Sequence, residues 1–587
     1  MTIFDWLILL IYLGSTFFIG FYLSQRNRNQ DDYFVAGRSL SGWLAGASMA
    51  ATTFSIDTPL YVAGLVGSRG LSANWEWWSF GLAHVAMTVV FAPLWRRTGV
   101  LTDAAFTELR YGGKIAAWLR GIKAFLLAVP INCIGIGYAF LALKKVAEAL
   151  GVVNGNYLFN GVSDTFLLLS LVGFLVLFYT VLGGLWAVVV TDLLQLFLAI
   201  FGAFAVAYFA VNAAGGMSQL LERLDALNRP ELLSLFPWDW ENASPNWIEE
   251  AGISIATFCS YIAFQWWSFR RSDGGGEFIQ RMLATRDENQ AQLAGWFFLV
   301  VNYILRSWLW ILVALSALVL LPNQQDWELS YPILAIRFLP PIILGFVVVS
   351  LVAAFMSTVS TSLNWGSGYL THDLYQRFLR PEAGQKELLI IGRITSVVLM
   401  FLGVFTAFLS DSIGAVFRLA IAIGTGPGVV LVLRWFWWRI NAASELAAML
   451  SGFLIGLSTS LIPWFRIEDY GWRLIVTTLL SAFVWVTVLL LTPPESEEIL
   501  EAFVMKIRPP GPGWRKFRIE LGVQSIDTLW NLGLRFLLSV LILYGAMLGI
   551  GSFLLHQIRG GWLGLLISVI AFFIMRKRSF SDLISYS

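Results

Sequence analysis

The chain has 587 residues, of which 58% are hydrophobic and only 13% are charged, and its mean hydropathy is +0.72. This composition excludes a soluble protein of this length and predicts a helical protein that crosses a membrane many times. The net charge of +2 does not indicate a class of partner, and no nucleic-acid partner is expected. Two cysteines, Cys133 and Cys259, are too few for a disulfide framework. We expect the lipid bilayer and a small-molecule solute as partners, and a chain that works as a monomer.

Runs of about 20 apolar residues, long enough to cross a bilayer core, recur along the chain. We expect about fifteen spans. The first is interpreted as a transmembrane span and not as a cleaved signal peptide, because it lacks a basic leader and a small-residue cleavage site. The spans lie near residues 4–24, 39–68, 75–96, 117–149, 163–182, 185–212, 248–268, 291–321, 339–372, 387–409, 413–438, 443–464, 471–491, 531–554 and 561–576.

Basic residues concentrate in alternate loops, and cytoplasmic loops of membrane proteins carry the excess of Lys and Arg. One basic loop follows the seventh span and contains Arg270, Arg271 and Arg281. The largest loop on the opposite side, residues 213–247, is acidic, and we expect a short surface helix at 218–227. This pattern predicts a multi-pass protein of the cell membrane with its N-terminus outside and its C-terminus in the cytoplasm.

The second span is interrupted at its centre. Residues 48–59 hold several hydroxyl side chains, the carboxylate of Asp57 and a proline, Pro59. Proline removes a backbone donor, and Ser or Thr can satisfy the backbone groups that a broken helix frees. An interrupted span with an ionisable residue at its centre is typical of the substrate and ion site of a transporter. A harmless proline kink is the alternative interpretation.

Four stretches, in the same order and spacing, closely resemble the sodium:solute symporter family, which includes sodium/proline, sodium/glucose and sialic acid symporters. They are residues 38–40, residues 183–188 with Thr191, Asp192 and Gln195, residues 279–284, and residues 353–358. The resemblance covers roughly residues 1–490 and implies an all-α membrane protein of the leucine-transporter type, with two inverted five-helix repeats at its core.

The resemblance and the spans together predict seven segments. They are the first span with a cytoplasmic loop (1–38), the first repeat (39–212), an outer loop (213–247), the second repeat (248–440), two additional spans (441–492), a cytoplasmic linker (493–530), and a C-terminal helical hairpin with a tail (531–587).

A sodium site is the first functional expectation, with Na⁺ as the coupling ion. The resemblance implies that its ligands are the carbonyls of Ala51, Phe54 and Ala354 and the hydroxyls of Ser357 and Thr358. The two hydroxyls fit this role on chemical grounds also, because they are polar neighbours in an otherwise apolar span and unwound carbonyls with hydroxyls suit sodium. The alternative is that these small residues only pack helices together.

A second sodium site is possible around Asp192, since a carboxylate within an apolar span is costly and usually functional. Ser357, Ser360 and Thr361 share one helix face at spacings of three and four residues. Some relatives bind a second sodium between the matching aspartate and such hydroxyls. The competing interpretation makes Asp192 a buried hydrogen-bonding group near the first site.

The substrate cavity should lie between the broken second span and the seventh span. Its predicted residues are Asp57, Thr58, Glu76, Ser79, Gln265, Trp266 and Trp267. Aromatic faces can pack on a solute while a carboxylate or amide fixes its polar groups. Thr58 stands where sugar-carrying relatives have Gln, which argues against a hexose. Arg306, in the middle of the eighth span, is expected either to have a structural partner or to contact an anionic solute.

These features predict a sodium-coupled secondary symporter that imports a small organic solute by alternating access. Sugars, amino acids, carboxylates, vitamins and osmolytes all occur among relatives. A solute receptor on a transporter fold and proton-coupled uptake are the alternative functions. An enzyme is not expected, because the sequence has neither a G-x-x-x-x-G-K-[ST] phosphate loop nor an H-E-x-x-H motif.

Overall fold

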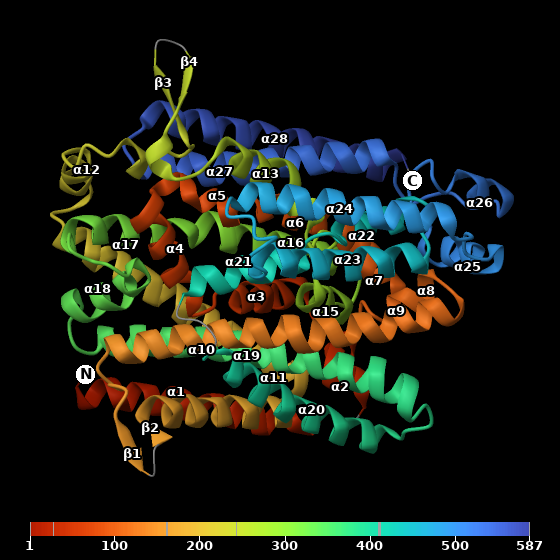
Figure 1. The fold of residues 1–587 in the computed structure, drawn as a ribbon, viewed down its shortest axis with the longest axis horizontal. Helices are drawn as coiled ribbons and strands as arrows, with labels where there is room; N and C mark the ends of the chain where they lie inside the picture. Colours follow the sequence, from red (N-terminus) through yellow and green to blue (C-terminus); the bar gives the residue numbers. More distant parts are fainter. Residues whose placement is uncertain (1, 27–28, 160–161, 242–243, 409–411, 586–587) are drawn as a thin grey trace.

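A computed structural model describes residues 2–26, 29–159, 162–241, 244–408 and 412–585. The long helices run side by side along one axis, as membrane spans do (Figure 1). Helix α1 begins at one end of this axis, and α28 finishes towards the other end. The predicted first and last segments, 1–38 and 531–587, each include a few residues outside the described ones.

Helices in the first part of the chain, with 3₁₀ and π-helical turns labelled η, have the following bounds. They are α1 (Ile3–Leu23), η1 (Ser24–Arg26), α2 (Gln30–Val35), η2 (Ala36–Arg38), α3 (Gly42–Thr53), α4 (Asp57–Arg69), η3 (Leu71–Asn74), α5 (Trp75–Trp78), α6 (Phe80–Ala86), η4 (Met87–Phe91), α7 (Ala92–Thr98), α8 (Phe106–Arg110), α9 (Gly113–Leu126), η5 (Leu127–Ile131), α10 (Asn132–Ala149), α11 (Asp164–Ala213) and α12 (Met217–Asp225).

The remaining helices follow in the same notation. They are η6 (Pro230–Leu232), η7 (Glu249–Ala251), α13 (Ile255–Ser260), η8 (Tyr261–Gln265), α14 (Trp266–Ser268), α15 (Gly276–Ala284), α16 (Glu288–Leu299), η9 (Val300–Leu305), α17 (Ser307–Leu320), η10 (Trp327–Leu329), α18 (Ser330–Phe338), α19 (Ile343–Gly368), η11 (Tyr369–Leu379), α20 (Gln385–Thr406), α21 (Ile413–Gly424), α22 (Gly428–Phe436), α23 (Ala442–Leu461), α24 (Tyr470–Leu491), α25 (Glu497–Ile507), α26 (Arg515–Glu520), α27 (Leu529–Leu554) and α28 (Ile558–Ser585).

Helix occupies every stretch in which a span is predicted. Within the described residues, eleven continuous helical stretches are long and apolar enough to cross a membrane. One of them is α11, which covers two predicted spans and departs from helical geometry at Gly184. The other predicted spans fall on interrupted pieces: α3 with α4, α13 with η8 and α14, and α21 with α22. The multi-pass architecture is confirmed, while the total of about fifteen spans stays a prediction.

The second span is broken as the sequence predicts. Helix α3 ends at Thr53 and α4 begins at Asp57, so three residues between them are not helical. Pro59 lies in the first turn of α4, where a backbone N–H has no partner within the helix and its absence is tolerated. The proline therefore starts a second helix, and a simple kink within one continuous helix does not describe this segment.

The seventh span is also followed by a break. The stretch after the break was expected to be a cytoplasmic loop, but it contains a buried helix. The backbone at Gly274 and Gly275 has φ values of 137° and 78°, a region that other residues rarely adopt. The chain then re-enters the protein as α15, all nine residues of which are buried. Gly276 packs so closely on Trp365 that a Cβ atom would lie 2.2 Å from its ring. Arg281 on α15 is accordingly 1% exposed and is not a loop residue.

Two short antiparallel hairpins amend the expectation of an all-α chain. They are formed by β1 (Tyr157–Phe159) with β2 (Val162–Ser163), and by β3 (Trp238–Glu241) with β4 (Ser244–Trp247). Both project from the helical body in Figure 1. The short helix predicted in the acidic loop is present as α12, with Gly216 as its N-cap.

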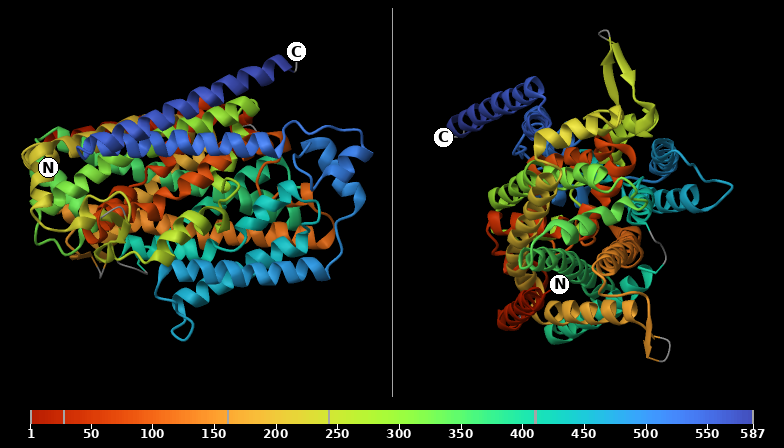
Figure 2. Two further views of the ribbon diagram at one scale, coloured as in Figure 1. Left: turned by 90° about the horizontal axis from the view of Figure 1, so that it is seen from above. Right: turned by 90° about the vertical axis from the view of Figure 1, so that its left-hand side faces the viewer.

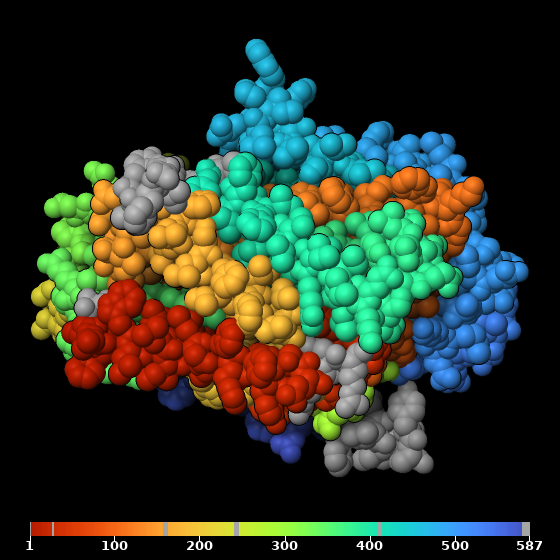
Figure 3. Space-filling view, turned by 90° about the horizontal axis from the view of Figure 1, so that it is seen from below, coloured from red at the N-terminus to blue at the C-terminus, as the bar shows by residue number. Residues whose placement is uncertain are grey.

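The outer helices expose the apolar side chains expected to face lipid. Helix α1 lies along the surface in Figure 3, with Phe18 66% exposed. On the opposite side, α27 and α28 form an antiparallel pair along the body (Figures 1 and 2). Helix α27 is fixed to the core, because Tyr544 donates a hydrogen bond to the carbonyl of Trp78 at 2.6 Å and Trp308 donates one to the carbonyl of Met547 at 2.8 Å.

Candidate functional site

The break between α3 and α4 meets α19 at Thr358. The hydroxyl oxygen of Thr358 lies 3.0 Å from the carbonyl oxygen of Thr52 and 3.2 Å from that of Ala354. One hydroxyl thus joins the unwound end of α3 to the middle of a helix 300 residues later in the chain. Three oxygens from two segments converge here, which is the kind of shell that a sodium ion prefers in a membrane transporter.

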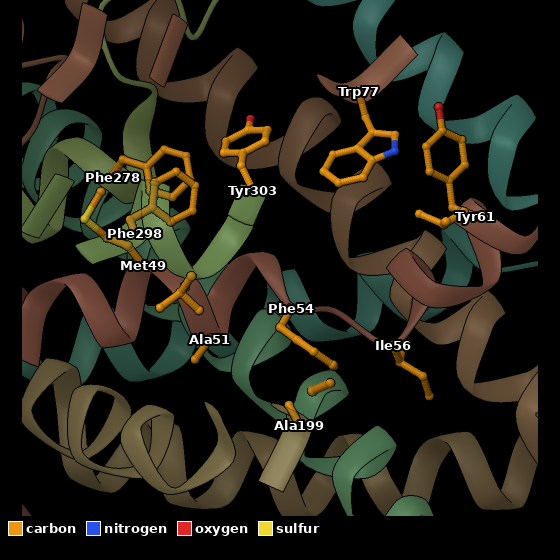
Figure 4. Close-up of a cluster of buried hydrophobic side chains, with 14 of the residues drawn as sticks. Met49, Ala51, Phe54, Ile56, Tyr61, Trp77, Ala199, Phe278, Phe298 and Tyr303 are labelled. Carbon is orange, nitrogen blue, oxygen red and sulfur yellow. The ribbon is translucent and has the colours of Figure 1, made fainter. Parts of the chain in front are cut away.

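Two other predicted sodium ligands, Ala51 and Phe54, lie at the end of α3 next to the break (Figure 4). The amide of Phe54 donates to the carbonyls of Ala50 and Ala51, both at 3.0 Å, so the last turn of α3 is tightened before the chain unwinds. The ring of Phe54 packs edge-on against Trp310. Ser357 is turned away from the junction and makes its hydrogen bond elsewhere. The structure therefore brings Thr358 and the break together, and gives Ser357 another partner.

That partner is Asp192, which is fully buried on α11. Its two carboxylate oxygens accept hydrogen bonds from Ser357 at 2.6 Å and from Ser48 at 2.5 Å. The guanidinium of Arg281 lies 3.7 Å from the same carboxylate. Asp192 thus has two hydroxyl donors and one cation among the described residues.

The remaining hydroxyls of the predicted second sodium site have separate partners. Thr361 accepts a hydrogen bond from Arg281 at 2.7 Å and lies 3.0 Å from the hydroxyl of Thr52. Ser360 donates to the carbonyl of Ser357 on its own helix at 3.1 Å. Arg281 therefore stands between Asp192 and Thr361, at the position where the two groups would share an ion.

A cavity of about 210 Å³ opens beside the break. Its walls come from the break and α4, from α6, η5, α10, α15, η9 and α19, and from α21. Aromatic side chains supply much of the wall, including Trp77 and Tyr303, whose rings stack with centroids 5.9 Å apart. In Figure 4 these two rings lie across from the unwound stretch that carries Phe54 and Ile56. Polar and charged side chains make up much of the remaining wall, and aromatic surface combined with polar groups suits a small-molecule site.

Two predicted substrate residues, Asp57 and Thr58, line this cavity, and the other five do not. Glu76 is buried behind the wall, because Arg69 and Arg418 pair with it at 2.7 and 3.4 Å. Tyr61 also donates a hydrogen bond to it at 2.7 Å. This carboxylate therefore joins α4, α5 and α21 through ion pairs.

The remaining four predicted residues are held by protein groups. The side-chain amide of Gln265 donates to the carbonyl of Glu76 at 2.6 Å and to the hydroxyl of Ser79 at 3.0 Å, so the two side chains satisfy each other. Trp266 stacks on Phe536 of α27. Trp267 packs on Phe264 of its own helix. Neither tryptophan is among the residues that line the cavity.

Sequence reasoning missed several residues that do line the cavity. They are Tyr138 and Asn132 on α10, Asn302 on η9, and Arg270 with Arg271 in the second break. Isolated amides within apolar spans were a usable signal, because buried amides need partners. The sequence assigns these arginines to a loop, because arginines at the end of a span normally face the cytoplasm. Two π-helical turns, η5 and η9, also contribute to the wall, and such turns are frequent at functional sites.

Comparison with known proteins gives a consistent result. A profile of the Sodium:solute symporter family matches residues 33–452. A sodium/glucose cotransporter from Vibrio parahaemolyticus is 26% identical over 491 residues, covering 78% of this chain and 85% of that one. An osmoregulated proline transporter from Bacillus subtilis (strain 168) is 26% identical over 473 residues, covering 77% of this chain and 87% of that one.

A solved structure shares the fold. The substrate-bound, outward-open structure of a Na⁺-coupled sialic acid symporter matches with a TM-score of 0.64 at 19% identity, covering 84% of this chain and 99% of that one. The arrangement of helices is thus that of a known sodium symporter. Helices α27 and α28 lie beyond the family match, which ends at residue 452.

Proposed function

The chain belongs to the sodium:solute symporter family, and from this premise we propose that it imports a small organic solute by coupling its movement to that of sodium. The family and the relatives are transporters, so the chain is a membrane transporter and not an enzyme. The solute, the ion site and the transport cycle are the parts that we add. Each rests on the geometry of the two breaks.

The sodium site that we propose consists of the carbonyls of Ala51, Phe54 and Ala354 with the hydroxyls of Thr358 and Ser357. The observation that carries it is the 3.0 Å contact between the hydroxyl of Thr358 and the carbonyl of Thr52, which already joins the two segments. Sodium at this junction would use hydroxyl and carbonyl oxygens that otherwise bond to each other. Ser357 would have to turn from Asp192 to take part.

The cycle that we propose is alternating access between two inverted repeats, residues 39–212 and 248–440. Both proposed repeats begin with a broken span, and the two breaks face one cavity. Sodium would order the first break, solute would bind beside it, and one bundle would rock against the other. The N-terminus would lie outside and the C-terminus in the cytoplasm, with residues 493–530 as a cytoplasmic linker.

The surroundings of Asp192 bear on whether one or two sodium ions bind in each transport cycle. A second sodium between Asp192, Ser357, Ser360 and Thr361 would require Arg281 to move, because its guanidinium lies against both Asp192 and Thr361. The geometry favours a structural, ion-paired aspartate and a single sodium. A sodium Hill coefficient near two with two charges moved per neutral solute would instead establish the second site.

The test is a thermal-shift screen of the purified protein against a metabolite panel in sodium chloride and in potassium chloride. We expect sodium to raise the melting temperature of the wild type and to increase the effect of the transported solute. Thr358→Ala should abolish the sodium effect. The matched control is Thr487→Ala, since Thr487 is partly exposed and its hydroxyl donates to the carbonyl of Phe483 on its own helix. If sodium stabilises neither protein, or stabilises wild type and Thr358→Ala equally, the proposed site is wrong; uptake that tracks pH at a fixed sodium gradient would favour proton coupling.

A further inference from the structure

Arg306 is a buried cation whose hydrogen-bond partners are all neutral. Its guanidinium donates to the carbonyl of Ala50 and to the hydroxyl of Thr53, both at 2.6 Å, and to the side-chain oxygen of Asn302. Its Nε atom is buried and has no partner. No carboxylate of the described residues forms an ion pair with it, although Arg306 is only 1% exposed and lines the cavity.

The cavity as a whole carries excess positive charge. Its described lining contains three arginines, Arg270, Arg271 and Arg306, and two acids, Asp57 and Glu277. Arg271 pairs with Glu277. Asp57 forms no ion pair with either remaining arginine, and one of its carboxylate oxygens is buried without a partner. With sodium bound at the break, the positive excess would rise further.

The neutral contacts of Arg306 compensate part of the cost of burying its charge. It lies at the C-terminus of α3, where the helix dipole favours a cation, and its guanidinium lies 5.3 Å from the ring centre of Phe54 and 5.2 Å from that of Trp310. A capping role would explain the bond to Ala50. It would not explain why a full charge, open to a solute cavity, lacks the carboxylate partner that the buried Arg281 and Arg434 both have.

We propose that the solute carries a carboxylate, and that Arg306 binds it in the cavity. This inference rests on the proposed symport function and names the substrate class of that same cavity. A planar guanidinium with free N–H groups suits a carboxylate, and the bond would be charge-assisted in a site screened from water. The aromatic wall at Trp77, Tyr303 and Trp310 would hold the body of the solute.

The position of Arg306 also gives sodium a way to assist solute binding. Arg306 holds the carbonyl of Ala50, and the next carbonyl along the chain, that of Ala51, belongs to the proposed sodium site. Sodium would therefore place a second positive charge close to the guanidinium. A carboxylate would bind more tightly when sodium is present, and by linkage sodium would bind more tightly when the carboxylate is present.

The experiment compares matched pairs of solutes that differ only at the carboxylate. The pairs are glucuronate and glucose, proline and prolinamide, phenylacetate and phenylacetamide, and lactate and lactamide, each at up to millimolar concentration. Apparent affinities for the full-length purified protein are measured by thermal shift in sodium chloride and in potassium chloride. The variants are Arg306→Gln and Arg306→Lys, with Arg466→Gln as the control, because Arg466 pairs with Glu468 on the surface far from the lining residues.

In sodium, we expect the carboxylate of at least one pair to bind wild type about 10- to 100-fold more tightly than its neutral partner, the range of a charge-assisted hydrogen bond. Arg306→Gln should remove this preference, Arg306→Lys should retain part of it, and Arg466→Gln should leave it unchanged. The wild-type comparison needs no variant to fold. Binding of neutral solutes as tight as that of carboxylates, binding by no carboxylate, or an unchanged preference in Arg306→Gln would overturn the proposal. Stabilisation of the wild type by sodium in the absence of solute tests the symport proposal independently. Its failure is therefore distinguishable from failure of the carboxylate proposal.

Discussion

Two buried arginines near the broken spans illustrate two uses of charge inside a membrane protein. Arg281 lies against Asp192, and serine hydroxyls complete the hydrogen bonding of that carboxylate. Arg306 lies against a helix end, an amide and aromatic rings, and no acid of the described residues pairs with it. The first cation is neutralised by the protein itself, so it fixes structure. We propose that a ligand neutralises the second cation, and the following predictions test this difference.

The largest expected effect comes from breaking the Asp192–Arg281 pair. Removing one partner leaves a buried charge without compensation, which costs about 3–5 kcal/mol, and Asp192→Asn or Arg281→Gln should therefore lower the melting temperature strongly. The double variant Asp192→Asn/Arg281→Gln should recover much of the loss. Arg306→Gln should cost less than either single variant, about 1–3 kcal/mol, since it leaves only neutral acceptors unpaired.

Thermal unfolding in detergent, without solute and with potassium in place of sodium, measures all four proteins. If the double variant is no more stable than the singles, or if Arg306→Gln is the least stable of the four, the contrast between a paired and an unpaired arginine fails.

A smaller effect is expected where α15 packs on α19. Gly276→Ala would place a methyl group 2.2 Å from the Trp365 ring, and forcing α15 outward should cost about 1–3 kcal/mol and move Arg281 from Asp192. Gly384→Ala is the matched control, since no atom lies within 4 Å of the added carbon and the backbone there is compatible with alanine. Equal melting temperatures for the two variants would contradict the buried position of α15.

The smallest effect distinguishes residues of the cavity from residues behind it. Trp77→Ala should weaken solute binding about 3- to 10-fold, because it removes an aromatic wall that stacks on Tyr303. Trp267→Ala should leave the affinity unchanged, because Trp267 packs on Phe264 and does not line the cavity. Titration of the solute found in the screen measures both. A larger loss of solute affinity for Trp267→Ala than for Trp77→Ala would contradict this distinction and would support the predicted contact of Trp266 and Trp267 with the solute.

Local signals in the sequence predicted the parts of the molecule that depend on local chemistry. Apolar runs located the helices, and Pro59 with its neighbouring hydroxyls located the first break. Family resemblance indicated Thr358, which the structure places against that break. Glu76 lies outside the cavity lining and pairs with Arg69 and Arg418, and the sequence does not indicate this pairing because tertiary packing sets it.

The second break was harder to predict, for a physical reason. Arginines at a span end normally face the cytoplasm, and the same residues bury only when a tertiary partner is present. Asp192 is that partner for Arg281, and it lies 89 residues earlier in the chain. The run of glycines before α15 was the visible sign that the chain turns back into the protein.

Binding of radioactive ²²Na⁺ to the purified protein tests the central claim most directly. We expect saturable binding of one sodium per chain to the wild type and to Thr487→Ala, with sodium displaced by unlabelled sodium and not by potassium. Thr358→Ala should weaken this binding at least about tenfold, because it removes the hydroxyl that joins the break to α19. Wild-type affinity in Thr358→Ala, or no saturable sodium binding to the wild type, would contradict the account.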